Sequence, residues 1–414
     1  MNLLKTSVLN GLAVLIKTAI MFILNKILAV YVGPSGYAMI GQFQNFIQMI
    51  TTFAGSAINT AVIKYTAEYY ESESKQVAIW KTAGSLVLVF SISFSFLILI
   101  FQKQLSVYIF QTIEYQSVFR WFSLFLVLFN LNALLLAILN GKKEIQKLVF
   151  ANIAGSIVSL LITSLLTIQY NLYGALISLS IYQSLAFFVT VFLCYKTKWF
   201  KFSNLFGRIE PEITKKLAAF ALMALVSTIC IPLSQMVIRF YLTHEFGLNY
   251  AGYWDAMMRV SSSYLMLVTT ILGVYYLPRL SEINSVTEIK KEIFLGYKFI
   301  LPFSIIFGFL IYIFREEIIL ILFTSSFLPI KELFLWQTIG DVLKIGSWIL
   351  GYLMLSKAMV RLYILTEIIY ILFSIFSSYI FTQIYGFNGM SFAHFLSYAV
   401  HWIILGIFVF RGIK

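Results

Sequence analysis

The sequence predicts an all-α polytopic membrane protein with about 12 transmembrane helices, arranged as two parallel six-helix repeats. Hydrophobic residues make up 60% of the 414-residue chain and charged residues only 11%, against about a quarter in soluble domains. The apolar segments run unbroken for about 20 residues or more, whereas a β-barrel would show alternating strands of about ten residues. The pattern of segments and joints in the first half also recurs in the second.

Each apolar segment is long enough to cross the roughly 30 Å hydrocarbon core as a helix. The first segment contains lysines and is too long for a signal-peptide core, so we expect it to be retained. In chain order, the expected spans are 8–32, 37–62, 79–101, 118–140, 148–169, 173–195, 217–241, 250–277, 296–314, 330–356, 362–384 and 388–410. They predict an N-terminal lobe at 1–195, a cytoplasmic inter-lobe linker at 196–216 and a C-terminal lobe at 217–414.

The distribution of basic residues orients the chain in the membrane. An even number of spans places both termini on one side, and that side carries 21 of the 30 Lys and Arg residues. Because short cytoplasmic loops carry the excess of Lys and Arg, both termini are expected in the cytoplasm. The formal net charge of +13 then divides as +12 on this side, 0 opposite and +1 within the membrane. No nucleic acid or acidic partner is needed to explain the basic composition.

The two halves share landmarks at a nearly constant offset of 213 to 215 residues. Because each half has an even number of spans, the repeats run in the same direction and are related by an axis along the membrane normal. Transporters built in this way bind substrate between the two lobes. The matches include Trp121 with Trp336, Ile100-Phe101 with Ile313-Phe314, and Asn171-Leu172-Tyr173-Gly174 with Gly386-Phe387-Asn388-Gly389.

Charged residues inside the apolar spans are the strongest indication of function. A charged side chain at the bilayer centre costs about 2.5–3.5 kcal/mol, so such side chains should face protein or a water-filled cavity. Alternatively, i,i+4 or i,i+3 neighbours could simply neutralise one another. Lys17 and Lys26 lie on opposite faces of a straight helix, so they share one cavity only if that helix bends. The six intramembrane charges are Lys17, Lys26, the i,i+4 pair Asp255 and Arg259, and the i,i+3 pair Asp341 and Lys344.

Polar side chains follow one face of several spans. In the second span, a stripe that includes Asn45 and Gln48 covers an arc of about 80°. The C-terminal half carries charges at positions where the N-terminal half carries amides, which predicts an electrically asymmetric cavity between the lobes. The repeat offset pairs Asn45 with Arg259, Asn130 with Lys344, and Asn152 with Glu367.

Residue patterns typical of enzymes are missing from the sequence. We find no P-loop, no zinc-binding pattern and no nucleophile elbow, so neither an enzyme nor a cofactor is expected. Cys194 and Cys230 have no metal-ligand spacing, which favours a packing role. His394 and His401 lie seven residues apart on one face of the last span and could relay protons, although a structural pair is the favoured interpretation.

Several segments resemble the Wzx family of lipid-linked oligosaccharide flippases, within the superfamily that includes the MATE multidrug exporters. The similarity is greatest to the enterobacterial-common-antigen type and extends over nearly the whole chain. The segments that carry it are Gly340-Asp341-Val342-Leu343-Lys344, Arg361-Leu362-Tyr363-Ile364-Leu365-Thr366-Glu367, Val32-Gly33-Pro34 and Leu277-Pro278-Arg279-Leu280.

This resemblance implies a V-shaped, MATE-like transporter of the bacterial inner membrane, with a central cavity that opens alternately to cytoplasm and periplasm. The implied cargo is undecaprenyl pyrophosphate carrying an oligosaccharide repeat unit for O-antigen or a related surface polysaccharide. A coupling proton or sodium ion and an association with polysaccharide polymerase machinery are further expected partners, together with membrane lipid.

Individual roles follow from position within the spans, since the resemblance does not assign them. Arg259 and Lys344 are predicted anion contacts, with Asp255 and Asp341 as orienting partners. Glu367 is the predicted titrating carboxylate. The remaining predicted cavity residues are the cations Lys17 and Lys26 and the sugar-binding amides Asn45, Gln48, Asn130 and Asn152.

Two other functions compete with the flippase interpretation. A multidrug or small-molecule antiporter of the same fold would favour acidic residues in its cavity, whereas the predicted cavity has four basic residues against three acids. A membrane glycan polymerase or ligase would need a sizeable outer loop, and the joints on that side are short.

Overall fold

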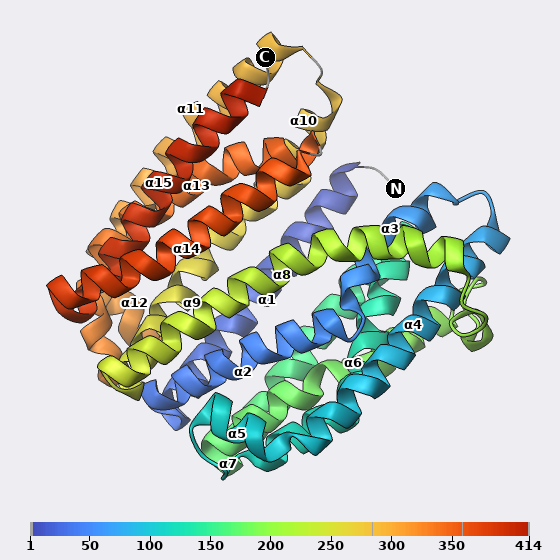
Figure 1. The fold of residues 1–414 in the computed structure, drawn as a ribbon, viewed down its shortest axis with the longest axis horizontal. Helices are drawn as coiled ribbons and strands as arrows, with labels where there is room; N and C mark the ends of the chain where they lie inside the picture. Colours follow the sequence, from blue (N-terminus) through green and yellow to red (C-terminus); the bar gives the residue numbers. More distant parts are fainter. Residues whose placement is uncertain (1–2, 284, 358, 413–414) are drawn as a thin grey trace. The chain divides into compact units, whose positions relative to one another are not determined.

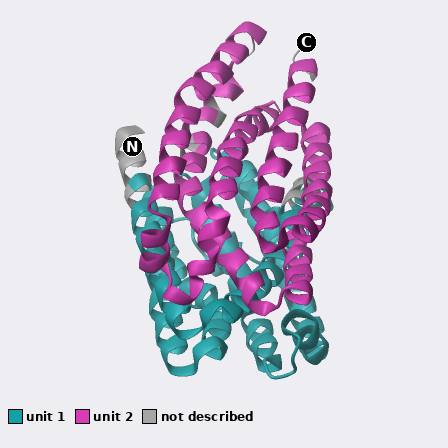
Figure 2. Ribbon diagram, turned by 90° about the vertical axis from the view of Figure 1, so that its left-hand side faces the viewer, with its two compact units in different colours: residues 1–232 teal, residues 233–414 magenta. Residues whose placement is uncertain are grey.

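The computed structural model describes residues 3–283, 285–357 and 359–412, and every regular element in these ranges is a helix. The prediction of an all-α polytopic protein is therefore confirmed. The chain forms two compact units, Met1–Pro232 (unit 1) and Leu233–Lys414 (unit 2), shown in teal and magenta in Figure 2. The division falls inside a helix, so the predicted lobe boundary at 196–216 stays a prediction.

The helices of unit 1 appear in Figure 1 in blue to green. α6 packs against both α4 and α7 and forms the centre of this unit. In order they are α1 (Leu3–Tyr31), α2 (Gly33–Phe53), η1 (Ser56–Ile58), α3 (Asn59–Glu68), α4 (Glu73–Ile100), α5 (Gln102–Phe110), α6 (Gln116–Gly141), α7 (Ile145–Tyr195) and η2 (Phe202–Asn204), followed by α8 (Pro211–Glu245), which contains the boundary between the units.

In unit 2, α13 packs against α11 and α15, and α14 lies beside α15 (Figure 1). The packing of α13 against α11 and α15 matches that of α6 against α4 and α7 in unit 1. The helices are α9 (Leu248–Ile271), the π-helical η3 (Leu272–Tyr276), α10 (Leu277–Glu282), α11 (Val286–Ile313), α12 (Arg315–Leu322), η4 (Ser325–Leu333), α13 (Phe334–Ser356), α14 (Val360–Tyr385), η5 (Gly386–Asn388) and α15 (Gly389–Gly412).

Each expected span lies largely within helix, but the breaks differ from the prediction. The second span is interrupted at Gly55, and its two parts meet at a bend of 67°. The fifth and sixth spans form the single 51-residue helix α7, which is kinked at Asn171. Among the described residues, seven segments are long and apolar enough to cross a membrane, or eight if the bent pair forms one span. Two of them, α7 and Val360–Arg411, each contain two of the expected spans.

The backbone confirms the internal repeat at its joints. Phe101 and Phe314 end α4 and α11 with nearly the same dihedral angles, and each is followed by a short helix, α5 or α12, that the sequence did not predict. The kink at Asn171 (φ 48°, ψ −130°) recurs at Gly386 (φ 61°, ψ −152°). Sequence positions 215 residues apart therefore adopt the same unusual conformation.

The glycines after these kinks explain part of the repeated motif. A Cβ at Gly174 would lie 1.9 Å from the carbonyl oxygen of Leu166, and a Cβ at Gly389 would lie 2.0 Å from that of Phe381. Such separations are far below van der Waals contact, so only glycine lets the helical segments before and after each kink approach this closely.

Exposed aromatic side chains indicate the face that meets lipid. Phe299, Phe303 and Phe309 on α11 are 60–67% exposed, although the interior of unit 2 is filled by aliphatic side chains such as Ile349 and Leu353. A soluble domain would rarely expose a row of phenylalanines, whereas a transmembrane helix does so at no cost.

Candidate functional site

A buried cluster of three charges joins α8 to α9 in unit 2. Asp255 accepts a hydrogen bond from Arg239 Nη2 at 2.6 Å on one carboxylate oxygen and from Arg259 Nε at 2.9 Å on the other. The side chains of Arg239, Asp255 and Arg259 are 5%, 8% and 20% exposed. Two guanidinium groups thus share one carboxylate, and the formal charges of these three side chains sum to +1.

The sequence predicted only half of this cluster. The pairing of Asp255 with Arg259 agrees with their i,i+4 spacing. Arg239 lies near the end of the expected seventh span, 217–241, and was not among the predicted site residues. An arginine inside an otherwise apolar segment was the available signal, because such a side chain needs a buried counter-charge.

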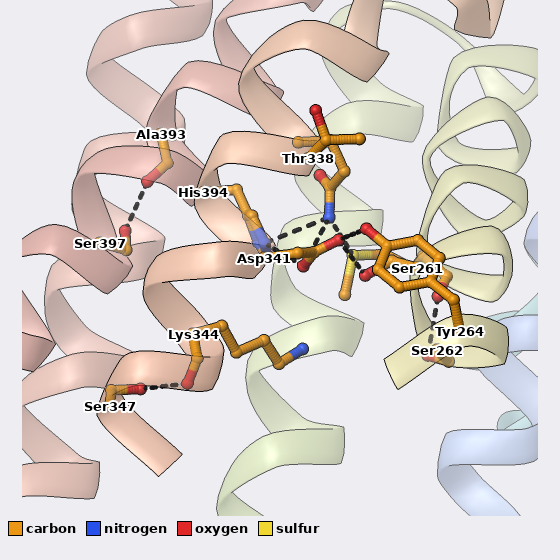
Figure 3. Close-up of polar contacts among 12 residues, drawn as sticks. Ser261, Ser262, Tyr264, Thr338, Asp341, Lys344, Ser347, Ala393, His394 and Ser397 are labelled. Atoms are coloured by element: carbon orange, nitrogen blue, oxygen red, sulfur yellow. Dashed lines mark hydrogen bonds and ion pairs between the residues drawn. The ribbon is translucent and has the colours of Figure 1, made fainter. Parts of the chain in front are cut away.

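A second polar cluster surrounds Asp341 on α13, whose side chain is 1% exposed. One carboxylate oxygen accepts hydrogen bonds from Ser261 Oγ at 2.6 Å and from the Tyr264 hydroxyl. The other carboxylate oxygen lies 3.0 Å from Nε2 of His394 on α15. The same His394 nitrogen lies 3.1 Å from the Gln337 amide nitrogen. Figure 3 shows the side chains of Ser261 and Tyr264 on α9, Asp341 on α13 and His394 on α15 pointing toward one another.

A small pocket adjoins this carboxylate between α9, α11 and α13. It has a volume of about 20 Å³, which is room for about one water molecule. The polar residues in its lining are Tyr264, Ser304, Thr338 and Asp341, and the remainder of the lining is apolar. The pocket therefore places a water-sized space directly beside a hydrogen-bonded carboxylate.

Lys344 does not pair with Asp341, although their i,i+3 spacing suggested local neutralisation. Within the described part of the chain, no carboxylate lies within 4 Å of Lys344 Nζ. The ammonium group instead lies 5.2 Å from the ring centres of both Trp348 and Tyr398. Aromatic faces stabilise a cation while leaving it able to meet an external anion.

Aromatic rings extend the second cluster along α14 and α15. The ring of Tyr398 lies 4.9 Å from that of His394 and 4.7 Å from that of Tyr370, which in turn lies 4.9 Å from His401. Both ring nitrogens of His401 are buried and lack a hydrogen-bond partner among the described groups. Glu367 on α14 is half-buried. The two histidines are connected through tyrosines and not by a direct contact.

The predicted polar residues of unit 1 are more dispersed. Asn130 is 1% exposed and donates from its amide to Ser91 Oγ at 2.9 Å and to the Ala54 carbonyl at 3.3 Å. These bonds attach α6 to α4 at the break after α2, a structural role in this conformation. The other predicted residues are half-buried at Lys26 and Asn45 and exposed at Lys17, Gln48 and Asn152.

Comparison with known protein families and curated proteins shows which family the chain belongs to. The family model described as "Polysaccharide biosynthesis protein" matches residues 3–284. The chain is 28% identical over 419 residues to proteins named lipid III flippase from Escherichia coli (strain K12) and Shigella flexneri, with 99% of each chain covered.

Solved structures identify the fold. A MATE family multidrug transporter in its inward-facing conformation matches with a TM-score of 0.78 at 12% identity, covering 95% of both chains. An outward-facing conformation of a MATE family transporter matches with a TM-score of 0.62 at 15% identity, covering 97% of this chain and 95% of the other. The MATE-like fold is therefore confirmed, and at these identities the likeness extends to the fold alone.

Proposed function

The chain belongs to the polysaccharide biosynthesis protein family, and from this premise we propose that it is a Wzx-type flippase for lipid-linked oligosaccharides. The observation that carries the proposal is the match to proteins named lipid III flippase over 99% of both chains. The proposed cargo is an undecaprenyl-pyrophosphate-linked repeat unit for O-antigen or a related surface polysaccharide. It would move from the cytoplasmic to the periplasmic leaflet of the inner membrane, with both termini cytoplasmic.

Arg259 is the proposed contact for the anionic pyrophosphate. Asp255 accepts a hydrogen bond from its Nε, and Arg239 binds the other oxygen of that carboxylate, so the three side chains together carry a formal charge of +1. Burial strengthens the attraction, because charges interact more strongly in a medium of low dielectric constant. Lys344, held between two rings, is the proposed second cation. Both would attract the cargo's phosphates while the polyprenyl tail stays in lipid.

The proposed transport cycle is alternating access between two lobes, with the remaining predicted residues lining the cavity. Lys17 and Lys26 would act as cavity or gate cations. Asn45, Gln48 and Asn152 would donate hydrogen bonds to sugars, whereas Asn130 already uses its amide inside unit 1. Association with a polymerase stays a prediction.

The proposed driving ion is a proton carried by the pair of Asp341 and His394. Their 3.0 Å contact beside a water-sized pocket supports this choice. Glu367, half-buried on α14, is the titrating carboxylate predicted from the sequence and is the alternative carrier. Reconstituted protein should flip cargo faster when a pH gradient is imposed. Equal acceleration by a sodium gradient at constant pH would assign the coupling to sodium instead.

Deletion of the gene tests the proposed function. We expect the strain to accumulate an undecaprenyl-pyrophosphate-linked oligosaccharide, identified by mass spectrometry of its lipid extract, and to lose the corresponding surface glycan. Normal display of that glycan in a strain with no substitute flippase would refute the proposal. Drug hypersensitivity without any accumulated intermediate would favour the multidrug antiporter. The relatives are named as flippases rather than enzymes, in agreement with the missing enzyme motifs.

A further inference from the structure

Five lysines gather around aromatic rings at one end of unit 1, and we call this group the lysine-aromatic collar. The rings of Tyr65 and Tyr69 are stacked with centres 6.1 Å apart. The distances from each lysine Nζ to the ring centre are all below 6 Å. Around the stacked pair, Lys64 lies 5.1 Å and Lys216 5.9 Å from Tyr65, and Lys75 lies 5.5 Å from Tyr69. Lys142 lies 5.4 Å from Tyr70 and 5.8 Å from Trp80, and Lys143 lies 5.8 Å from Tyr70.

The collar is built by close packing between α3, α4 and α6. A Cβ at Gly141 would lie 2.6 Å from Thr66 Cβ, so glycine is needed where the end of α6 meets α3. Lys142 Nζ donates to Gln76 Oε1 at 2.9 Å, and the fully buried Gln76 in turn donates to the Thr66 carbonyl at 2.6 Å. These bonds hold the Lys142 ammonium group in one position.

Lys143 occupies a conformation that L-residues rarely adopt. Its φ is +57°, in the left-handed region where glycine is the unstrained choice. The strain places a second ammonium group beside Tyr70, next to that of Lys142. Backbone strain of this kind is often retained at functional positions.

The surroundings leave the collar with an excess of positive charge. Residues 64–81, 142–147 and 196–216, which form this end of unit 1, contain twelve Lys and Arg against six Glu. Among the described ion pairs, none joins Lys75, Lys142, Lys143 or Lys216 to a carboxylate. All of these except the half-buried Lys142 are exposed. Their charges can therefore neutralise an anion from outside the chain.

The position of the collar indicates which anion. Lys75 lies in the first turn of α4 and Lys142 directly follows α6, two helices long and apolar enough to cross a membrane. Tyrosine, tryptophan and lysine at such helix ends lie at the level of the lipid headgroups. We infer that the lysine-aromatic collar is a binding site for the phosphate headgroup of an anionic phospholipid in the adjoining leaflet. This inference does not depend on the cargo proposed above.

Native mass spectrometry of the purified full chain tests the inference with three probes: phosphatidylglycerol, phosphatidylcholine and inorganic pyrophosphate. The test variant is Lys75→Gln with Lys143→Gln, which leaves the buried Gln76 network intact. The matched control is Lys196→Gln with Lys201→Gln, two exposed lysines of the same unit outside the collar. We expect wild type to retain phosphatidylglycerol over phosphatidylcholine, and the test variant to lose about fivefold for each lysine removed.

Lys143→Gly separates binding from folding. It should raise the melting temperature, because it relieves the strained φ, and yet weaken phosphatidylglycerol retention. Equal losses in test and control variants would overturn the site, as would equal retention of the two phospholipids by wild type. Selective binding of pyrophosphate without phosphatidylglycerol would also overturn it, since the collar would then recognise a soluble or cargo phosphate.

Discussion

Replacing Asp255 by Asn removes the carboxylate that Arg239 and Arg259 share while keeping the size of the side chain. The Arg239 contact is 2.6 Å long with both side chains less than a tenth exposed, so water can replace little of the lost attraction. Removing one partner of a buried ion pair costs about 3–5 kcal/mol. At about 2–4 °C per kcal/mol for a unit of this size, Asp255→Asn should lower the melting temperature by about 6–20 °C.

The two arginines provide graded comparisons within the same cluster. Arg239→Gln leaves Asp255 paired with Arg259, so its cost should be smaller than that of Asp255→Asn. Arg259 is 20% exposed, and Arg259→Gln should therefore have the smallest effect on stability while abolishing transport. Melting is measured on the detergent-solubilised full chain by its monodisperse fraction after heating, and transport by flipping of lipid-linked oligosaccharide in proteoliposomes.

Two results would refute this reasoning. Wild-type stability of Asp255→Asn would mean that the arginines are neutralised by other groups. Wild-type transport by Arg259→Gln, with correct folding, would return the cluster to a purely structural role.

Three further predictions concern other parts of the chain. Lys344→Ala should abolish flipping and Lys344→Arg should largely retain it, because the rings hold either cation; equal activity of both variants in proteoliposomes would contradict this. Tyr264→Phe removes a donor to a buried carboxylate and should cost about 1–3 kcal/mol, read as a lower melting temperature. Gly174→Ala and Gly389→Ala should each lower the free energy of unfolding by about 1–3 kcal/mol, because the new Cβ clashes with a carbonyl oxygen. The control Gly351→Ala has open space at its Cβ and should have the melting temperature of the wild type.

Comparing the two halves of the chain predicted which joints are structurally equivalent. Matching Asn171 with Gly386 and Gly174 with Gly389 predicted equivalent positions, and the backbone angles and close approaches confirm them. The joints expected at 170–172 and 385–387 contain both kinks, but the backbone angles at these joints were not predicted. Local sequence marks where a joint falls and says less about the angle it makes.

The sequence by itself determined the all-α membrane fold, since the transfer free energy of each segment depends on its own composition and length. It also indicated which charges are unusual. Only the tertiary structure decided their partners: Arg239 meets Asp255 across two helices, and His394 rather than Lys344 meets Asp341. Contacts between helices depend on how each helix is rotated and packed against its neighbours, and spacing along one helix does not contain that information.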